Sequence, residues 1–291
     1  MNNNFAILTD SSIDLPADLV AKYNIDVIPL HVTIGDKTYA NYPDEREITA
    51  VSLYAQLREG AVAQTSATNP ETYKEVLEEY MKAGRDVLFL GLSSGLSCTT
   101  ASCEMAAQEL REEYPQRTII VIDSLCACLG HGLLAIQAAN ERAKGKDIQE
   151  VAKFAKDIRL KIGHWFTVDD LFFLKRGGRV SATTALLGSA LGIKPLLHMD
   201  DEGHLISVSK ARGRKKVMQT MIERMKETII NPTDQIIYIG HGDCIEDATY
   251  LANLAKETFS PQDVVLNQIG PVIGAHSGPG TLAIFFLATS R

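Results

Sequence analysis

The sequence has no excess of positive charge. Its 291 residues include 29 Lys and Arg against 36 Asp and Glu, which gives a formal net charge of -7 and a pI near 5.5. General binding to nucleic acid or to anionic membranes is therefore not expected, because both attract cationic surfaces. The balance favours solubility and still allows local basic patches.

The chain also has neither a signal-peptide pattern nor an unbroken apolar run of membrane length. Its first ten residues, MNNNFAILTD, contain no basic region followed by an apolar stretch. Residues 264–290 contain no Asp, Glu, Lys or Arg, but Gly and Pro residues between 270 and 280 interrupt them. We therefore expect a cytoplasmic protein without a transmembrane segment.

The five cysteines form no CxxC pair. Cys126 and Cys128 make a C-x-C, while Cys98 and Cys103 lie five residues apart in an expected helix. Neither spacing matches paired zinc ligands or the disulfide framework of a secreted protein. We expect reduced, buried thiols, with no metal site and no cofactor.

Within the first 160 residues, short apolar segments alternate with helical patterns. Continuous apolar strands separated by helices predict a parallel sheet that is covered on both faces. Ligands of such sheets bind beyond the carboxyl ends of the strands, where hydroxyl-rich segments occur in this chain. The expected strands are 5–9, 26–32, 86–90 and 118–122, and the expected helices include 70–82, 130–144 and 148–161.

After residue 160 the pattern changes. The residues Asp200 to Gly203, DDEG, lie between two apolar segments and indicate a hairpin turn. A hairpin among alternating strands and helices predicts a mixed sheet. The fold class is therefore α/β with two α/β domains, an N-terminal parallel-sheet domain (1–160) and a C-terminal mixed-sheet domain (161–291), and with the ligand at their junction. The expected C-terminal strands are 164–168, 193–199, 205–209, 235–240, 263–269 and 281–288, with helices near 212–229 and 244–257.

The segment 91–100, GLSSGLSCTT, contains a G-x-S-x-G pattern centred on Ser93. This pattern is typical of the nucleophile elbow, in which a serine occupies a sharp turn between a strand and a helix. A serine esterase or thioesterase with Ser93 as its nucleophile is therefore one hypothesis. The remaining triad members would come from Asp169, Asp170 or Asp243 and from His241 or His276.

An anion-binding role is the second hypothesis for this segment. Ser94 and Ser97 add hydroxyls that a nucleophile elbow does not need, and no HGGG-type oxyanion motif precedes them. A second hydroxyl-rich segment, 64–70 or QTSATNP, also leads into a helix, and helix N-termini attract anions. Neither segment contains Lys or Arg, and neither GxxxxGK[ST] nor GxGxxG occurs, which favours a carboxylate over a phosphate. Ordinary helix capping is the alternative interpretation.

His276 lies in the glycine-rich segment 274–281, GAHSGPGT. So many glycines predict a tight backbone that carries the imidazole to a defined position. A solvent-exposed histidine in a turn is the alternative. His241 follows a strand end, where capping of the next helix is the favoured interpretation.

Two further features concern the C-terminal domain. Residues 180–193, VSATTALLGSALGI, carry no charge and fit either the wall of an apolar tunnel or a buried helix. The basic clusters fit an acidic partner or a phosphorylated ligand, or a solvated face. They are Lys175, Arg176 and Arg179, followed by Lys210, Arg212, Arg214, Lys215 and Lys216.

Together these segments resemble the DegV family. The resemblance runs along essentially the whole chain in family order, and LKRGGR and HSGPGT are its most specific parts. The matching segments are FAILTDSS (5–12), Thr65-Ser66, GLSSGLS (91–97), Asp123-Ser124, TVDDLFFLKRGGRVS (167–181), His241-Gly242-Asp243 and IGPVIGAHSGPGT (269–281).

The resemblance implies a two-domain α/β protein that holds a long-chain fatty acid with its acyl chain buried. Family members act as the B subunit of bacterial fatty acid kinase, which is not catalytic alone. They present the carboxylate to a separate, ATP-using kinase subunit and keep the acyl-phosphate product. Carried over to this chain, the carboxylate ligands are Thr65, Ser93, Ser94 and His276, so that Ser93 binds and does not attack. Arg176, Arg179 and Arg212 would lie toward the kinase-docking surface.

The chain departs from the family pattern at two positions. Ala67 stands where members usually have Gln, and Cys98 stands where many have Gly. Neither departure changes Thr65, Ser93 or His276.

Overall fold

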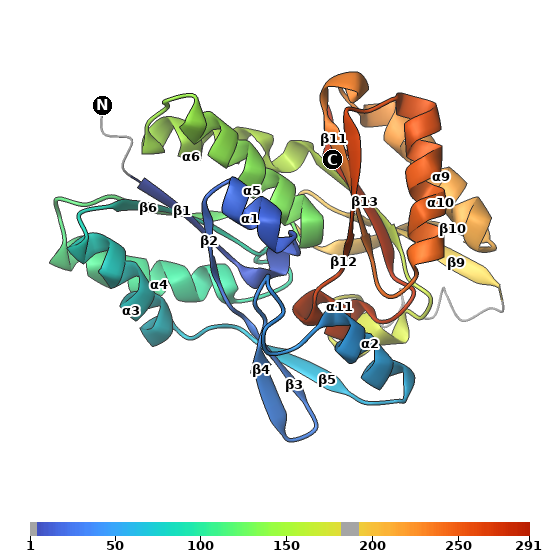
Figure 1. The fold of residues 1–291 in the computed structure, drawn as a ribbon, viewed down its shortest axis with the longest axis horizontal. Coiled ribbons are helices and arrows are strands. Elements are labelled where there is room, and N and C mark those ends of the chain that lie inside the picture. Colours follow the sequence, from blue (N-terminus) through green and yellow to red (C-terminus); the bar gives the residue numbers. More distant parts are fainter. Residues whose placement is uncertain (1–4, 182–191) are drawn as a thin grey trace.

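The computed structural model describes residues 5–181 and 192–291 (Figure 1). Most of the uncharged segment 180–193 therefore lies outside the described residues, so neither interpretation of it, tunnel wall or buried helix, is tested. Residues 5–161 are called the N-terminal half here, and residues 162–181 and 192–291 the C-terminal half. No helix within the described ranges is long and apolar enough to cross a membrane.

The N-terminal half is built on a four-stranded parallel sheet, as predicted. Its strand order is β2-β1-β6-β7, and every neighbouring pair is parallel. Alternate residues of β1 face opposite layers: Ile7 packs toward α5 and α6, and Leu8 packs toward α3 and α4. The strands are β1 (Phe5–Asp10), β2 (Ile25–Ile28), β6 (Asp86–Gly91) and β7 (Ile119–Asp123). The helices are α1 (Ala17–Lys22), α3 (Pro70–Lys82), α4 (Thr99–Glu113), α5 (Cys128–Ala143) and α6 (Ile148–Ile158).

Helix α3 illustrates how the sequence specifies these elements. The Asn69 side chain accepts a hydrogen bond from the backbone N–H of Thr72, and Pro70 occupies the first turn. Tyr73, Leu77 and Met81 then recur every four residues and are buried against the sheet.

The predicted strand 26–32 is wrong, because the chain changes sheet within it. Pro29 has no backbone N–H to continue a ladder, and it lies between the end of β2 and the start of β3. Strand β3 instead forms an antiparallel sheet of order β4-β3-β5, drawn at the bottom of Figure 1. This part of the chain contains β3 (His31–Ile34), β4 (Lys37–Ala40), α2 (Ala50–Arg58) and β5 (Ala63–Ser66).

The C-terminal half contains a six-stranded sheet of order β10-β9-β8-β13-β11-β12. Strand β11 pairs in parallel with β12 and antiparallel with β13, so the sheet is mixed, as predicted. The DDEG segment joins β9 and β10, which pair antiparallel. The strands are β8 (Ile162–Thr167), β9 (Ile193–Met199), β10 (Leu205–Arg212), β11 (Ile236–His241), β12 (Asp263–Gln268) and β13 (Leu282–Leu287). The helices are α7 (Phe172–Arg176), α9 (Arg214–Thr228), α10 (Ile245–Phe259) and α11 (Pro271–Ser277).

The two larger sheets share one hydrophobic core. Helices α9 and α10 cover one face of the C-terminal sheet, and the other face packs against α5. Helix α5 thus lies between the two sheets and buries side chains against both (Figure 1). The division into domains at residue 160 stays a prediction. The shared core shows that the two halves meet at a junction to which residues of both contribute.

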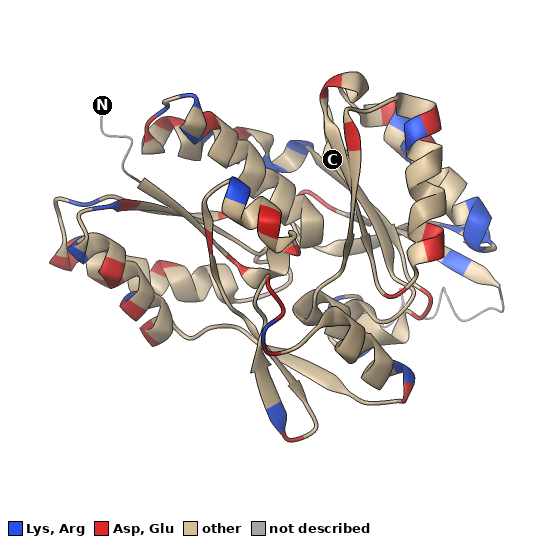
Figure 2. Ribbon diagram, viewed as in Figure 1, with Lys and Arg blue, Asp and Glu red and all other residues tan. Residues whose placement is uncertain are grey.

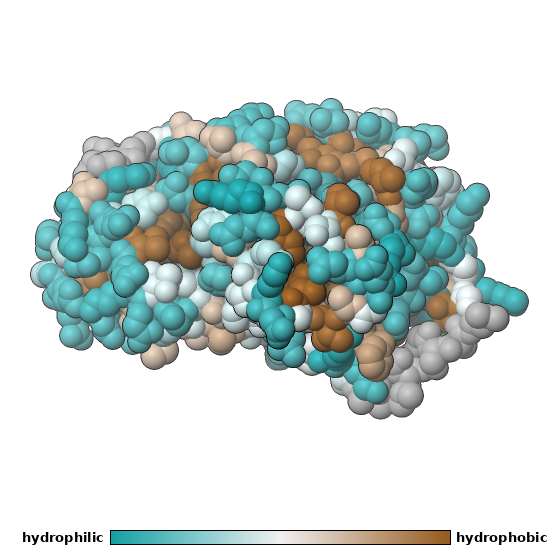
Figure 3. All heavy atoms as spheres, turned by 60° about the horizontal axis from the view of Figure 1, so that its bottom comes forward, coloured by the Kyte–Doolittle hydropathy of each residue, from teal (hydrophilic) through white to brown (hydrophobic). Residues whose placement is uncertain are grey.

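Charged side chains are distributed over the surface, with a local basic group at the end of β10 and the start of α9 (Figure 2). Its exposed members are Lys210, Arg212, Lys215 and Lys216. Arg214 of the same segment is instead held within the fold, because its guanidinium contacts Asp247 at 2.7 Å and the Gly280 carbonyl at 2.7 Å. Hydrophilic residues cover much of the face in Figure 3, and hydrophobic patches lie between them.

Candidate functional site

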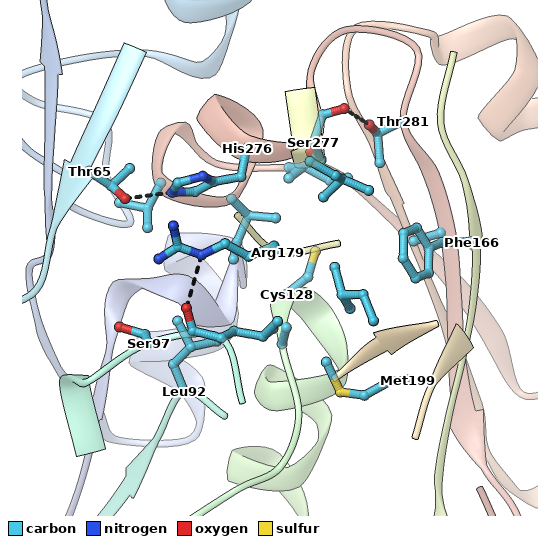
Figure 4. Close-up of a pocket in the computed structure, with 18 of the residues that line it drawn as sticks. Thr65, Leu92, Ser97, Cys128, Phe166, Arg179, Met199, His276, Ser277 and Thr281 are labelled. Atoms are coloured by element: carbon cyan, nitrogen blue, oxygen red, sulfur yellow. Dashed lines mark hydrogen bonds between the residues drawn. The ribbon is translucent and has the colours of Figure 1, made fainter. Parts of the chain in front are cut away.

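A cavity lies at the junction between the two halves. Its empty space amounts to about 860 Å³, which includes space open to solvent. The loops after β2 and β6, strand β5, the start of α5, and strands and helices of the C-terminal half form its walls (Figure 4). Most of the lining is apolar and includes Leu92, Phe166, Leu174, Met199, Ile273 and Phe285.

Thr65 and His276 form the polar pair of this cavity. Thr65 Oγ1 and His276 Nε2 are joined by a hydrogen bond of 2.6 Å, and both residues line the cavity (Figure 4). Thr65 lies in strand β5 of the small sheet, and His276 lies in the last turn of α11. Two predicted ligands, 211 residues apart in the sequence, are thus brought together.

Part of the glycine-rich segment around His276 is helical, because residues 271–277 form helix α11 with Pro271 in its first turn. Gly274 is needed for packing: a Cβ there would lie 2.6 Å from the Tyr54 hydroxyl oxygen. Gly278, at φ 77°, follows the last helical residue. The glycines therefore serve the packing and the end of a helix.

His276 is neutral at physiological pH. Burial, together with the positive charges of Arg179 and Arg176, lowers the pKa of its imidazole to about 4. A neutral imidazole carries one N–H and one bare nitrogen. When Nε2 carries the proton and donates to Thr65 Oγ1, the Thr65 hydroxyl proton is free to donate to a ligand. An anionic ligand selects this tautomer, since the other would turn a Thr65 lone pair toward the negative charge.

Arg179 brings a cation to the site, although the two hydroxyl-rich segments contain none. The arginine is half-buried and lines the cavity; its Nε donates to the Leu96 carbonyl at 3.0 Å, and its Nη1 donates to the Gly177 carbonyl. In Figure 4 its guanidinium lies between His276 and Ser97. Because a half-buried guanidinium pairs well with a carboxylate, Arg179 adds to the affinity of this end of the cavity for an anion.

The hydroxyl of Ser93 forms its hydrogen bonds outside the cavity. Its side chain is fully buried, its hydroxyl donates to the Gly203 carbonyl at 2.9 Å, and it accepts from the Gly95 N–H at 3.2 Å. Gly203 lies in the turn between β9 and β10, so Ser93 connects the two halves. Neither Ser93 nor the exposed Ser94 lines the cavity, and the Ser94 N–H donates to Asp123 at 3.2 Å. Their role as carboxylate ligands stays a prediction.

The residues proposed for a catalytic triad also have other partners. Asp169 pairs with Lys194 at 2.7 Å, and Asp243 pairs with Arg58 at 2.7 Å. Asp170 accepts from the Phe172 N–H, and His241 accepts from the Cys244 N–H at 3.4 Å. Among the hydrogen bonds of the described residues, none joins the Ser93 hydroxyl to a histidine or a carboxylate.

Two of the three predicted docking arginines lie outside the cavity. Arg176 is exposed at the end of α7, with its guanidinium 4.9 Å from the centre of the Phe173 ring, and it acts on His276 through its charge. Arg212 is exposed at the end of β10. Contact of Arg176, Arg179 and Arg212 with a kinase subunit stays a prediction.

Several lining residues were not identified from the sequence as ligand contacts. Ser97 lines the cavity, although its hydroxyl is also hydrogen-bonded to Thr99 Oγ1 at 2.8 Å. The sequence signal for Ser97 was its position in the serine-rich segment 91–97. Cys128, at φ 54°, begins α5 at the cavity wall, and no pattern indicated it. Ala67, one of the two departures from the family pattern, also lines the cavity, whereas Cys98 is exposed.

Known proteins resemble this chain over its whole length. Residues 4–289 match the family model described as "Uncharacterised protein, DegV family". A DegV domain-containing protein of Clostridium perfringens is 42% identical over 287 residues, which make up 99% of this chain and 98% of the relative. The solved structure of a DegV family protein from Thermus thermophilus, described by its fatty acid binding, aligns with a TM-score of 0.88 and 30% identity, covering 99% of this chain and 100% of its own. The structure of DegV from Bacillus subtilis, described as a fatty acid binding protein, aligns with a TM-score of 0.85 and 28% identity, covering 98% and 99%.

Proposed function

The chain belongs to the DegV family, and we propose that it binds a long-chain fatty acid in the cavity between its two halves. The observation that carries this proposal is the composition of the cavity: an apolar lining with the hydrogen-bonded pair Thr65 and His276. An acyl chain gains free energy by leaving water for such a lining, at about 25 cal/mol per Å² of apolar surface. The fatty acid binding of similar proteins supports the same ligand.

The carboxylate belongs at the Thr65–His276 pair. The Thr65 hydroxyl donates to one carboxylate oxygen, and His276, with its proton on Nε2, fixes the orientation of that hydroxyl. The guanidinium of Arg179 offsets the negative charge, which would otherwise be costly to desolvate. Ser93 or Ser94 would contact the carboxylate only after a rearrangement of the loop after β6, since the Ser93 hydroxyl is bonded to Gly203.

The finer part of the proposal is that the bound carboxylate is presented to a separate kinase subunit that uses ATP. Two features support it. The sequence has no GxxxxGK[ST] motif with which to bind ATP itself. Arg176, which is exposed on α7, lies close enough to His276 to influence its pKa, so exposed positive charge adjoins the carboxylate end. The chain would then serve as a carrier that is not catalytic alone.

The alternative, a serine esterase or thioesterase that uses Ser93, is less well supported. A nucleophilic serine needs a base within hydrogen-bonding distance, but the Ser93 hydroxyl donates to a backbone carbonyl. A fluorophosphonate probe distinguishes the two functions. Stoichiometric labelling that is abolished by Ser93→Ala would establish the esterase, and no labelling is expected.

Native mass spectrometry of the purified protein tests fatty acid binding. We expect one bound mass that matches a C14–C18 fatty acid, and the delipidated protein should take up one added fatty acid per chain. Ligand-free protein that takes up none would refute the proposal. Addition of the cognate kinase subunit and ATP tests the finer part: acyl-phosphate should form with the loaded protein, and a failure to form it while the fatty acid stays bound would refute presentation alone.

A further inference from the structure

Helix α7 ends directly against the imidazole of His276. A Cβ placed on Gly177 would lie 2.3 Å from His276 Nδ1 and 3.3 Å from both Cε1 and Cγ. No ordinary contact is as close as 2.3 Å, because non-bonded heavy atoms prefer about 3.5–4.0 Å. The Cα of Gly177 therefore occupies the space beside the ring edge opposite Thr65.

The backbone of Gly177 does not itself require glycine. Its φ of -72° and ψ of -11° lie in the right-handed helical region, which any L-residue adopts. At the next residue, Gly178, the backbone conformation favours glycine but the surrounding space does not require it. Gly178 has a φ of 74°, in the region that favours glycine, and a Cβ there would meet nothing within 4 Å. The two glycines of the LKRGGR segment thus have different physical reasons to be glycine.

Gly177 also forms backbone hydrogen bonds, one to α7 and one with Arg179. Its N–H donates to the Phe173 carbonyl at 3.0 Å, which fixes it to α7, and its carbonyl accepts from Arg179. The imidazole therefore lies between the Gly177 backbone on one side and the Thr65 hydroxyl on the other. With a hydrogen bond of 2.6 Å to Thr65, the ring cannot retreat from an added methyl group without changing that bond.

We propose that Gly177 is a positioning residue: because it has no side chain, the His276 imidazole can lie where it holds the Thr65 hydroxyl toward the ligand. A methyl group at this position displaces the ring by about 1 Å, the difference between the contact above and an ordinary one. The expected loss of fatty acid affinity rests on the proposed function, whereas the position of the imidazole ring does not depend on it.

The test compares Gly177→Ala with Gly178→Ala, which adds the same methyl group one residue later in open space. NMR titration of the His276 imidazole in ligand-free protein is the first readout. In the wild type burial keeps the pKa at about 4, with Arg179 and Arg176 as the nearby charges. In Gly177→Ala the displaced ring should titrate at a pH different from that of the wild type, because its burial and its distances to Arg179 and Arg176 change. In Gly178→Ala it should titrate as in the wild type, although backbone strain lowers the melting temperature.

Fatty acid affinity is the second readout. We expect at least a tenfold loss in Gly177→Ala and less than a twofold change in Gly178→Ala. An unchanged His276 pKa together with unchanged affinity in Gly177→Ala would overturn the positioning role. If neither the wild type nor the variants bind fatty acid, the proposed function fails, but the titration still decides the role of Gly177.

If Gly177→Ala does not fold, a double variant still tests the proposal. The double variant Gly177→Ala/His276→Ala removes the ring with which the methyl group collides. It should fold with the stability of His276→Ala alone. If it also fails to fold, Gly177 is needed for a reason unrelated to His276, and the inference is wrong.

Discussion

The hydroxyl of Thr65 and the imidazole of His276 are 2.6 Å apart, although 211 residues separate them in the sequence. One belongs to a strand of the small antiparallel sheet and the other to a short helix of the C-terminal half. Their hydrogen bond joins the halves at the cavity, beside a half-buried arginine. The site therefore exists only when both halves are folded and packed together.

Substitution of Thr65 by valine should weaken fatty acid binding. Valine keeps the shape of threonine but removes the hydroxyl that donates to the carboxylate. A hydrogen bond to a charged group contributes about 1.5–3 kcal/mol, so the Kd should rise roughly tenfold to a hundredfold. Isothermal titration of delipidated protein measures this, with Thr65→Ser as the matched control that keeps the hydroxyl. Equal affinity of the valine variant and the wild type would contradict the assignment of Thr65.

Substitution of Ser93 by alanine should act mainly on stability. It leaves the buried Gly203 carbonyl without its donor, at a cost of about 1–3 kcal/mol in the free energy of unfolding. Urea unfolding measures this, with the exposed Ser94→Ala as a control that should change stability by less than about 0.5 kcal/mol. Fatty acid affinity should fall less than in Thr65→Val. A larger loss would show that Ser93 is a carboxylate ligand, as the family resemblance implies.

The pKa of His276 should rise when a fatty acid binds. Burial and two arginines hold it at about 4 in the free protein, and a neighbouring carboxylate favours the charged imidazole. Binding then takes up a proton as the pH falls toward the pKa of the complex, so affinity should increase in that direction. NMR titration with and without ligand measures the shift. An identical pKa in both states would place the carboxylate away from His276.

Replacement of Asp14 by asparagine should change how stability depends on pH. The pKa of Asp14 is raised to about 7, mainly by burial and also by the negative charge of Asp10, against the opposing effect of hydrogen bonds from Cys128 and Gly270. The folded state therefore keeps a proton that the unfolded state loses near pH 3.8, and this contribution to stability is lost as the pH rises toward 7.

The difference in unfolding free energy between Asp14→Asn and the wild type should therefore grow in favour of the variant from pH 4 to pH 7. The slope should approach 1.4 kcal/mol per pH unit between the two pKa values and flatten above pH 7. Urea unfolding of both proteins at several pH values measures it. A difference that stays constant with pH would show that Asp14 ionises normally in the fold.

Much of the fold could be predicted from local patterns. Strands β1 and β6 are continuous apolar runs followed by helices, and this is sufficient to indicate a parallel sheet. The prediction failed at 26–32, where the apolar pattern continues through Pro29 but the hydrogen-bond ladder does not. The sequence did not indicate helix α11 at 271–277, because glycines that allow close packing on Tyr54 look the same in sequence as glycines that form a turn.

Local sequence patterns also pointed to only some of the residues that line the cavity. The segments that contain Thr65 and His276 stood out by their composition, and the family resemblance singled out Thr65 within its segment. The partner of Ser93 could not be found in this way, since Gly203 is 110 residues away and contributes only a backbone carbonyl. The same holds for Arg179, whose guanidinium reaches the cavity because α7 ends beside His276. Contacts between distant loops depend on the packing of the two halves, which no local pattern records.

The most direct test of the account is the NMR signal of a fatty acid that carries ¹³C at its carboxyl carbon, bound to delipidated protein. One slowly exchanging signal per chain is predicted. It should differ from that of free fatty acid, and its chemical shift should change in both Thr65→Val and His276→Ala. A bound signal that is the same in the wild type and in both variants would contradict the account, because the carboxylate would then lie away from the Thr65–His276 pair.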